Sequence, residues 1–230
     1  KDLSKLSVIV YYTVGLAKKR KKRCQLITKI SSFLYSITKL KKTERNGDNM
    51  SEQHTQDLKK TPLYELQKNL NAKFVPFCGW SMPAFFKNVK DEHLYVRNHV
   101  GLFDVSHMGE ILVTGSFAKE FLNSMVTNDL DRLKPGFSQY TLMCLPDGGV
   151  IDDMIIYCQT ETSYFICVNA SNREKDFRWL CEHQPKDRDV QLKDVSDLWC
   201  QIAVQGPESD TLLKEVLGEH VEQKGSNITP

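Results

Sequence analysis

Two adjacent carboxylates, Asp152 and Asp153, lie within a run of apolar residues that extends to Tyr157. Successive side chains of a β-strand point to opposite faces, so Asp152 would share a face with Met154, and Asp153 a face with Ile155. Whichever face is buried, at least one carboxylate would lie against apolar side chains, where an unpaired charge is strongly destabilising. Such a group is retained because it is well hydrogen-bonded or because it acts on a ligand. The pattern leaves both roles, and the choice between the two aspartates, open.

A second candidate is the sequence Asp104-Val105-Ser106-His107, which contains the residue types of a hydrolytic triad. Triad residues must converge in space, and proximity in sequence says little about that. The sequence also lacks the Gly-x-Ser-x-Gly pattern of a nucleophile elbow. We therefore interpret Asp104 and Ser106 as turn or capping residues.

The remaining polar groups give weaker signals. His93, His99 and His107 do not have the spacing of two metal ligands on one helix, so we expect no metal site. The charged run 173–176 is predicted to be a solvated helix face rather than a binding site. No glycine-rich phosphate loop follows a predicted strand, which argues against a nucleotide-binding fold.

The aspartate pair lies in the second strand of a predicted hairpin. β-Prone runs at 138–145 and 149–158 flank Pro146-Asp147-Gly148, which is a favourable turn sequence. The segment 74–83 is apolar but contains two prolines and a glycine, so it is predicted to be irregular. Apolar, β-prone runs predict further strands at 110–114, 164–169 and 201–205.

Helices are predicted from their starting residues and from apolar spacing. Thr61, followed by a proline, is expected to cap a first helix, and Ser116 to cap a second. Ser171 and Glu174 have the spacing of a capping box and would open a third. A fourth is expected to start at Gly206-Pro207. Since strands and helices alternate irregularly, the predicted fold class is α+β, with mixed or antiparallel sheets and packed helices.

The first 49 residues differ from the rest in charge. They contain 13 Lys or Arg and 3 acids, whereas the other residues contain 18 Lys or Arg and 26 acids. We expect residues 1–49 to be a basic, disordered leader, explained by a true start at Met50, by an organelle transit segment or by a functional basic tail. A linker is expected at 50–60 and the globular domain at 61–230. The acidic globular part argues against nucleic acid as a partner.

Seven cysteines occur, none of them spaced as Cys-x-x-Cys. Their odd number and their positions in apolar runs favour buried, reduced thiols over metal ligands or a disulfide scaffold. The apolar stretch 6–17 is too short to cross a bilayer, which needs about 20 residues. We therefore expect no membrane partner.

Several motifs, taken together, resemble the T-protein family of the glycine cleavage system. The longest is Gly-Leu-Phe-Asp-Val-Ser-His-Met-Gly-Glu at 101–110. Shorter ones occur in the family's order at 61–64, 79–83, 127–129, 148–153, 168–176 and 205–207. The resemblance implies an aminomethyltransferase-type, folate-binding domain.

This resemblance implies a tetrahydrofolate-dependent aminomethyltransferase whose partner is lipoylated H-protein. Such an enzyme takes the aminomethyl group from the lipoyl arm, releases ammonia and forms 5,10-methylenetetrahydrofolate. In the family, the second aspartate of the pair contacts the folate and is the catalytic carboxylate, which is Asp153 here. The other folate contacts implied by motif position are Met108, Tyr140, Tyr157, Val168 and Asn169. For Tyr157 and Val168, apolar neighbours along their strands leave a role in the core equally open.

The later part of the family's sequence, with its carboxy-terminal barrel, would follow Pro230, so the domain is expected to be incomplete. Alternatives are a folate-binding paralogue of the tRNA-modification or iron–sulfur-assembly type, the folate domain of a dimethylglycine or sarcosine dehydrogenase, and a non-catalytic fragment. A cytoplasmic location is expected if the source is bacterial. A mitochondrial matrix location is expected if residues 1–49 are a transit segment.

Overall fold

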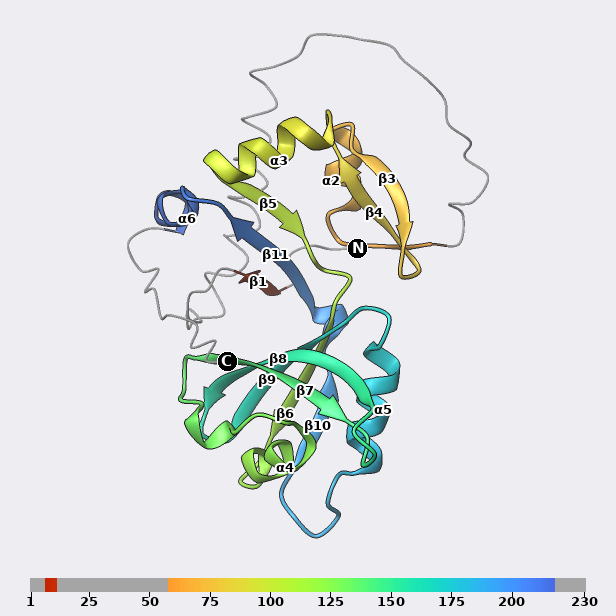
Figure 1. The fold of residues 1–230 in the computed structure, drawn as a ribbon, viewed down its shortest axis with the longest axis vertical. Coiled ribbons are helices and arrows are strands. Elements are labelled where there is room, and N and C mark those ends of the chain that lie inside the picture. Colours follow the sequence, from red (N-terminus) through yellow and green to blue (C-terminus); the bar gives the residue numbers. More distant parts are fainter. Residues whose placement is uncertain (1–6, 12–57, 218–230) are drawn as a thin grey trace. The chain divides into compact units, whose positions relative to one another are not determined.

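The computed structural model describes residues 7–11 and 58–217, which fall into two compact units (Figure 1). The central unit consists of Met108–Trp199. The flanking unit consists of the described residues that precede and follow this segment. Each unit has its own sheets and helices, as the α+β prediction requires.

The central unit is built on one five-stranded sheet in the order β10-β6-β9-β8-β7, and all neighbouring strands are antiparallel. Its strands are β6 (Gly109–Thr114), β7 (Ser138–Cys144), β8 (Val150–Thr160), β9 (Ser163–Val168) and β10 (Gln191–Asp194). Its helices are α4 (Ala118–Met125) and α5 (Arg173–Glu182), with the short 3-10 helices η3 (Leu130–Arg132) and η4 (Ser196–Leu198).

The core of this unit lies between one face of the sheet and the two α-helices. Alternate strand residues are fully buried there, among them Ile111 and Val113 in β6 and Ile156 in β8. Leu122 of α4 and Leu180 of α5 belong to the same cluster. The helices therefore cover one face, the core face, because they bring apolar side chains to it.

On β7 and β8, the opposite face of the sheet, which we call the open face, carries side chains that are exposed or half-buried, whereas Phe165 and Cys167 of β9 on the same face are buried. On β7 and β8 it consists of Tyr140, Leu142, Asp153, Ile155 and Tyr157. These residues share a face because the antiparallel register pairs Leu142 with Asp153 and Tyr140 with Ile155. The open face is thus where a ligand can reach the sheet.

The predicted alternation along β8 is regular from Asp152 to Cys158. Before Asp152 the pairing with β7 shifts by one residue, so the strand has a bulge there. Ile151 is consequently buried and Val150 exposed, the reverse of a regular strand. The bulge leaves the carbonyl oxygen of Ile151 available to Lys175 of α5, whose Nζ donates to it at 2.6 Å.

The flanking unit contains two three-stranded sheets, in the orders β1-β11-β5 and β2-β4-β3. The strands are β1 (Ser7–Tyr11), β2 (Lys59–Lys60), β3 (Lys73–Phe77), β4 (Trp80–Phe85), β5 (Gly101–Asp104) and β11 (Trp199–Gln205). The helices are α2 (Tyr64–Asn69), α3 (Val89–Asn98) and α6 (Ser209–Leu217).

Asp104, at the end of β5, holds several segments of this unit together. Its carboxylate accepts hydrogen bonds from Thr61 Oγ1 at 2.6 Å, Gln67 Nε2 at 2.8 Å and the Ser106 backbone N–H at 3.0 Å. Ser106 Oγ in turn donates to the carbonyl oxygen of Gln201 at 3.2 Å. The predicted structural role of Asp104 and Ser106 is therefore confirmed.

The hairpin and the three further strands predicted from sequence are confirmed within two residues at each end. They correspond to β7 with β8, and to β6, β9 and β11. The helix predicted after Gly206-Pro207 is α6. By contrast, α3 has no buried residue and therefore shows no clear apolar face, which explains why no helix was predicted there.

The prediction of an irregular segment at 74–83 is wrong, because this segment forms the hairpin β3–β4. Cys78 and Gly79 make its turn, and both have positive φ (49° and 78°), as a tight two-residue turn requires. Pro76 lies in an edge strand, and Pro83 lies beyond the two residues of β4 that pair with β2. Each proline therefore has a neighbouring strand on one side only, where the missing N–H is tolerated.

The capping residues predicted from sequence do not cap their helices. Thr61 donates to a carboxylate instead, and Ser116 hydrogen-bonds Asp189 through both its N–H and its hydroxyl. Ser171 is not the cap of α5, because Asn172 takes that position without a capping side-chain bond. For Thr61 and Ser116, a carboxylate distant in sequence competes successfully with the local backbone.

Most of the predicted leader lies outside the described residues. Within 1–49, the described segment is β1 (Ser7–Tyr11). The leader, the linker at 50–60 and the compartment therefore stay predictions, although β2 already begins at Lys59. In the part of the chain that the structure describes, no helix is both long and apolar enough to cross a membrane.

Candidate functional site

Asp153 lies on the open face and its side chain is exposed. Tyr140, on the neighbouring strand β7, donates its hydroxyl to Asp153 Oδ2 at 3.1 Å. This hydrogen bond is the main cause of the raised pKa of Tyr140, so its hydroxyl remains a donor at neutral pH. The hydroxyl reaches Asp153 diagonally, because Tyr140 pairs with Ile155 two residues further along β8.

Asn169, which directly follows β9, connects the two carboxylates. Its Nδ2 donates to Asp153 Oδ1 at 3.0 Å and to Asp152 Oδ1 at 2.9 Å, and it lies 3.1 Å from the carbonyl oxygen of Asp153. Its backbone N–H donates to Asp152 Oδ2 at 3.0 Å. One amide therefore links the buried carboxylate to the exposed one.

Asp152 is buried, with 4% of its surface exposed, and is surrounded by donors. Asn172 Nδ2 donates to its Oδ1 at 2.6 Å, in addition to the two bonds from Asn169. Burial by itself would raise the pKa of Asp152, but the hydrogen bonds from Asp176, Asn169 and Asn172 outweigh it, so the pKa is lowered. The structure thus distinguishes the two aspartates: Asp152 is the hydrogen-bonded, buried carboxylate, and Asp153 is accessible to a ligand.

Asp176, in the first turn of α5, is fully buried next to Asp152, and neither of its carboxyl oxygens has an amide, hydroxyl or amine donor. Burial, together with the hydrogen bond and the negative charge of Asp152, raises the pKa of Asp176 to about 8. Asp176 therefore carries a proton at neutral pH and can donate to Asp152, whereas two ionised carboxylates would repel each other. The prediction that 173–176 is a solvated helix face is wrong for this residue.

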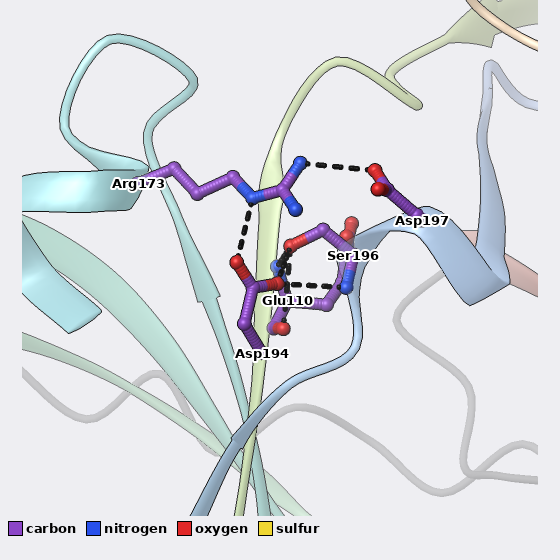
Figure 2. A network of polar contacts seen from close by, with 5 residues as sticks. All are labelled: Glu110, Arg173, Asp194, Ser196 and Asp197. Atoms are coloured by element: carbon purple, nitrogen blue, oxygen red, sulfur yellow. Dashed lines mark hydrogen bonds and ion pairs between the residues drawn. The ribbon is translucent and has the colours of Figure 1, made fainter.

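The same prediction also fails for Arg173. Its Nε donates to Asp194 Oδ2 at 3.0 Å and its Nη1 to Asp197 Oδ1 at 3.3 Å (Figure 2). Asp194 also accepts the hydroxyl of Ser196 at 2.6 Å, and the ion pair and these bonds outweigh burial and lower the pKa of Asp194. These contacts tie the start of α5 to the end of β10 and to η4, which follows β10.

Glu110 of β6 is a third buried acid, and it lies within this network (Figure 2). Its backbone N–H donates to Ser196 Oγ at 2.8 Å. Burial raises the pKa of Glu110 to about 9 in spite of the nearby positive charge of Arg173. Its carboxyl is therefore neutral at pH 7, and it takes no part in the hydrogen bonds around Asp153.

Close packing holds the strands that carry the site together. At Gly109, an added Cβ would lie 2.7 Å from Val168 Cγ2 and 2.9 Å from Arg173 Cγ, distances too short for a side chain. Gly109 pairs with Val168, the residue before Asn169. The absence of a side chain at this position thus allows α5 and the end of β9 to approach β6.

Three of the six predicted site residues are in direct contact, namely Asp153, Tyr140 and Asn169. Tyr157 lies on the same open face but further along β8. Its half-buried ring meets Phe165 in a T-shaped arrangement, with 6.3 Å between ring centroids. Tyr157 therefore has a packing role in addition to any contact with a ligand.

The other two predicted residues, Met108 and Val168, lie at the same end of the sheet as Asn169. Met108 is half-buried and precedes Gly109, the partner of Val168. Val168 is fully buried and pairs with Met154 on the core face. Its side chain therefore belongs to the core, and a contact between Val168 and a ligand would come from its backbone.

The histidines and cysteines that the structure describes give no second site. Among the described residues, no group of three or more His, Cys, Asp or Glu side chains is arranged to hold a metal ion. His107 is buried edge-on against Phe77, with 5.6 Å between ring centroids, and burial lowers the pKa of His107 despite the charge of Asp104. Free thiols are present, as predicted, but Cys78 and Cys181 are exposed rather than buried.

Sequence reasoning missed Asn172 and Asp176. They are four residues apart on α5, and the core residue Leu180 follows after four more. This helical spacing places all three on one face and was the available signal. The dense charges of the segment 173–176 obscured it.

The arrangement can bind and orient a ligand. An exposed carboxylate beside a phenol and an amide can accept hydrogen bonds from the N–H groups of a ligand. Donors from β7 and from the residue after β9 hold Asp153 before a ligand binds, so little ordering is needed on binding. The carboxylate can hold an N–H group in position and stabilise positive charge that develops next to it.

Comparison with known proteins identifies the relatives of this fold. Residues 63–227 match the family described as GCVT N-terminal domain. A protein named aminomethyltransferase from Geobacillus kaustophilus is 48% identical over 159 residues, which are 69% of this chain and 43% of the relative. One from Lysinibacillus sphaericus is 47% identical over 167 residues, covering 73% of this chain and 45% of the relative.

A solved structure agrees with these sequence matches. The crystal structure of glycine cleavage system aminomethyltransferase T from Bartonella henselae superposes with a TM-score of 0.65 and 36% sequence identity. The match covers 69% of this chain and 43% of that chain. This chain therefore spans less than half the length of the curated relatives it matches.

Proposed function

Because the chain belongs to the family of GCVT N-terminal domains, we propose that it carries the folate site of an aminomethyltransferase of the glycine cleavage system. The proposed substrates are tetrahydrofolate and the aminomethyl group carried on the lipoyl arm of H-protein. The products are ammonia, 5,10-methylenetetrahydrofolate and the reduced lipoyl arm. Since the chain spans less than half of its relatives, the activity of the whole protein is part of this proposal.

One observation carries the proposal. The accessible carboxylate of Asp153 is held by donors from β7 and from the end of β9. Tetrahydrofolate has a flat pterin and two amines, N5 and N10, that must accept the one-carbon unit. A fixed carboxylate on an open sheet face suits such a ligand, because it can accept an N–H and leave the ring to lie on Tyr140 or Tyr157.

In the proposed reaction, the folate amines attack the aminomethyl carbon in turn. The first step breaks a bond from this carbon to nitrogen or sulfur, and the second breaks the other. The two hydrogens lost from N5 and N10 account for one gained by ammonia and one gained by the lipoyl thiol. Asp153 holds the attacking amine and stabilises the positive charge that develops on it.

The other residues act on Asp153 or on the ligand. Tyr140 and Asn169 fix the orientation of the carboxylate. Met108, Tyr157 and the backbone of Val168 are proposed to complete the wall of the site. These roles are assigned from the positions of the residues in and beside the sheet.

The test is Asp153→Asn in the 230-residue chain. We expect it to abolish ammonia release from aminomethyl-lipoyl H-protein in the presence of tetrahydrofolate, and to weaken tetrahydrofolate binding in calorimetry at least tenfold. The matched control is Asp187→Asn, an exposed aspartate in the loop after α5, which should behave as the unmodified chain.

Two outcomes would contradict the proposal. Near-normal transfer by Asp153→Asn would show that this carboxylate is not the catalytic group. Tetrahydrofolate binding without ammonia release by the unmodified chain would show a folate-binding module instead of a transferase.

A further inference from the structure

Asp176 is the buried acid whose position has the clearest consequence for the site. Its side chain has no exposed surface, and neither of its oxygens receives a hydrogen bond from an amide, hydroxyl or amine group. The group that lies next to it is another carboxyl group, that of Asp152. Two carboxyl groups form a hydrogen bond only when one of them is protonated, so pairing of these two buried residues requires a proton.

The proton belongs on Asp176 rather than on Asp152. Asp152 already accepts three amide hydrogen bonds, from the backbone and side chain of Asn169 and from Asn172. These donors stabilise its ionised form. Asp176 has no such donors, so the neutral form is favoured there.

The bond from Asp176 matters to the site because Asp152 orients Asn169. The Nδ2 group of Asn169 lies 2.9 Å from Asp152 Oδ1 and 3.0 Å from Asp153 Oδ1. The orientation of the Asn169 amide therefore depends on the position of the Asp152 carboxylate. A hydrogen bond from Asp176 fixes the position of this carboxylate, and the carboxylate keeps the Asn169 amide directed at Asp153.

We propose that Asp176 is a positioning residue of the folate site: its protonated carboxyl donates to Asp152 and thereby keeps the Asn169 amide directed at Asp153. This inference rests on the proposed folate-binding role of Asp153. Asp176 does not touch the ligand. It acts through Asp152 and Asn169.

Ionisation of Asp176 would break this arrangement. The charged and titratable groups around Asp176 are Asp152 on β8, with Asp153 beyond it, and Lys175 on its own helix. The cation of Lys175 is engaged with the carbonyl oxygen of Ile151. A second negative charge would therefore stand against Asp152 and displace it from Asn169.

The consequence is a pH dependence centred on Asp176. Burial and the neighbouring Asp152 raise the pKa of Asp176 to about 8. Tetrahydrofolate binding should be constant below this pH and weaken above it by up to about tenfold per pH unit, if only the protonated form binds.

The decisive variant is Asp176→Asn in the 230-residue chain. Its amide can donate to Asp152 but does not ionise, so tetrahydrofolate affinity should stay within about threefold of the unmodified chain at pH 7 and lose its dependence on pH up to 9. Asp176→Leu has a similar volume and no donor, and should bind at least tenfold more weakly at every pH. Glu174→Gln, an exposed residue on the same turn of α5, is the control and should keep the normal pH profile.

A second readout does not require folate. The side-chain NH₂ resonances of Asn169, assigned by NMR with Asn169→Gln, should shift with a midpoint near the pKa of Asp176, about 8. They should not shift in this range in Asp176→Asn. Because this readout needs no ligand, it tests the inference even if Asp176→Leu fails to fold.

The two proposals fail in different ways. If the unmodified chain binds no tetrahydrofolate but the Asn169 resonances titrate as expected, the proposed function is wrong and the coupling between Asp176 and Asn169 stands. If tetrahydrofolate binds but Asp176→Asn keeps the pH dependence, or the Asn169 resonances do not respond, the positioning role of Asp176 is wrong.

Discussion

At the scale of single residues, two neighbouring aspartates do different work because the strand turns them to opposite faces. Asp152 is buried among amide donors, and Asp153 is exposed with a phenol and one amide beside it. A substitution of the same type should therefore have different effects at the two positions.

Asp152→Asn should lower the free energy of unfolding of the chain by about 2 kcal/mol, because an amide would face the N–H groups that the carboxylate now accepts. Asp153→Asn should change it by less than about 0.5 kcal/mol, as expected at an exposed position. Urea denaturation of both variants measures the difference. Equal losses of stability would contradict the division between a structural and a ligand-facing carboxylate.

The aspartate pair could be found from sequence, but its division of roles could not. Alternation predicted that the two side chains point apart, and this is correct. Which face is covered depends on α4 and α5, whose docking is a long-range property. Asp176 was missed for a related reason, since the charged residues around it suggested solvent while the helical spacing to Leu180 indicated the core.

At the scale of elements, β6, α5 and the segment after β10 meet around a neutral glutamic acid. Glu110 is 1% exposed, and Arg173 spans to Asp194 and Asp197 beside it. Burial raises the pKa of Glu110 from 4.5 to about 9. The contribution of such a group to the free energy of unfolding is fully present below its pKa in the unfolded chain. It is lost as the pH rises through its pKa in the folded chain.

In the unmodified chain, Glu110 should therefore lower the free energy of unfolding by up to about 1.4 kcal/mol for each pH unit between pH 5 and 9. Glu110→Gln should remove this part of the pH dependence. The glutamine keeps the size of the buried group and has no proton to lose. Thermal unfolding at several pH values measures the slope. The control is Glu120→Gln on the exposed side of α4, and a slope that stays unchanged in Glu110→Gln would contradict the assignment.

Elements next to a favourable turn sequence could be predicted from the sequence. Elements whose structure depends on contacts with residues distant in the sequence could not. The Pro146-Asp147-Gly148 turn located the β7–β8 hairpin. The prolines of β3 and β4 hid a second hairpin, because their effect depends on which strands pair beside them. The hydroxyl of Thr61 suggested a cap, but Asp104 is 43 residues away and takes that hydroxyl in the fold.

At the scale of the whole molecule, the flanking unit is discontinuous in sequence, because pairing of Gly101 with Gln205 joins segments on either side of the central unit. Sequence patterns are local and do not reveal such pairing. The flanking unit also exposes apolar side chains on α3, where Val89 is 63%, Leu94 47% and Tyr95 58% exposed.

This exposed helix predicts self-association of the chain, because exposed apolar surface favours contacts between molecules. Sedimentation velocity should show an average mass that rises with concentration. A Leu94→Ser and Tyr95→Ser double variant should reduce this rise without lowering the thermal midpoint, since neither residue is buried. A mass that is independent of concentration in the unmodified chain would contradict the prediction.

The alternation along β8 also makes the molecule a convenient starting point for redesign. Asp152, Met154 and Ile156 face the core, whereas Asp153 and Ile155 face outward. A combinatorial library restricted to the outward positions would sample new ligand preferences on a scaffold whose folding is specified by the inward ones. Asn169 is an exception because its side chain donates to both carboxylates. Varying Asn169 would change ligand binding and would also remove a hydrogen bond to the buried Asp152, which lowers stability.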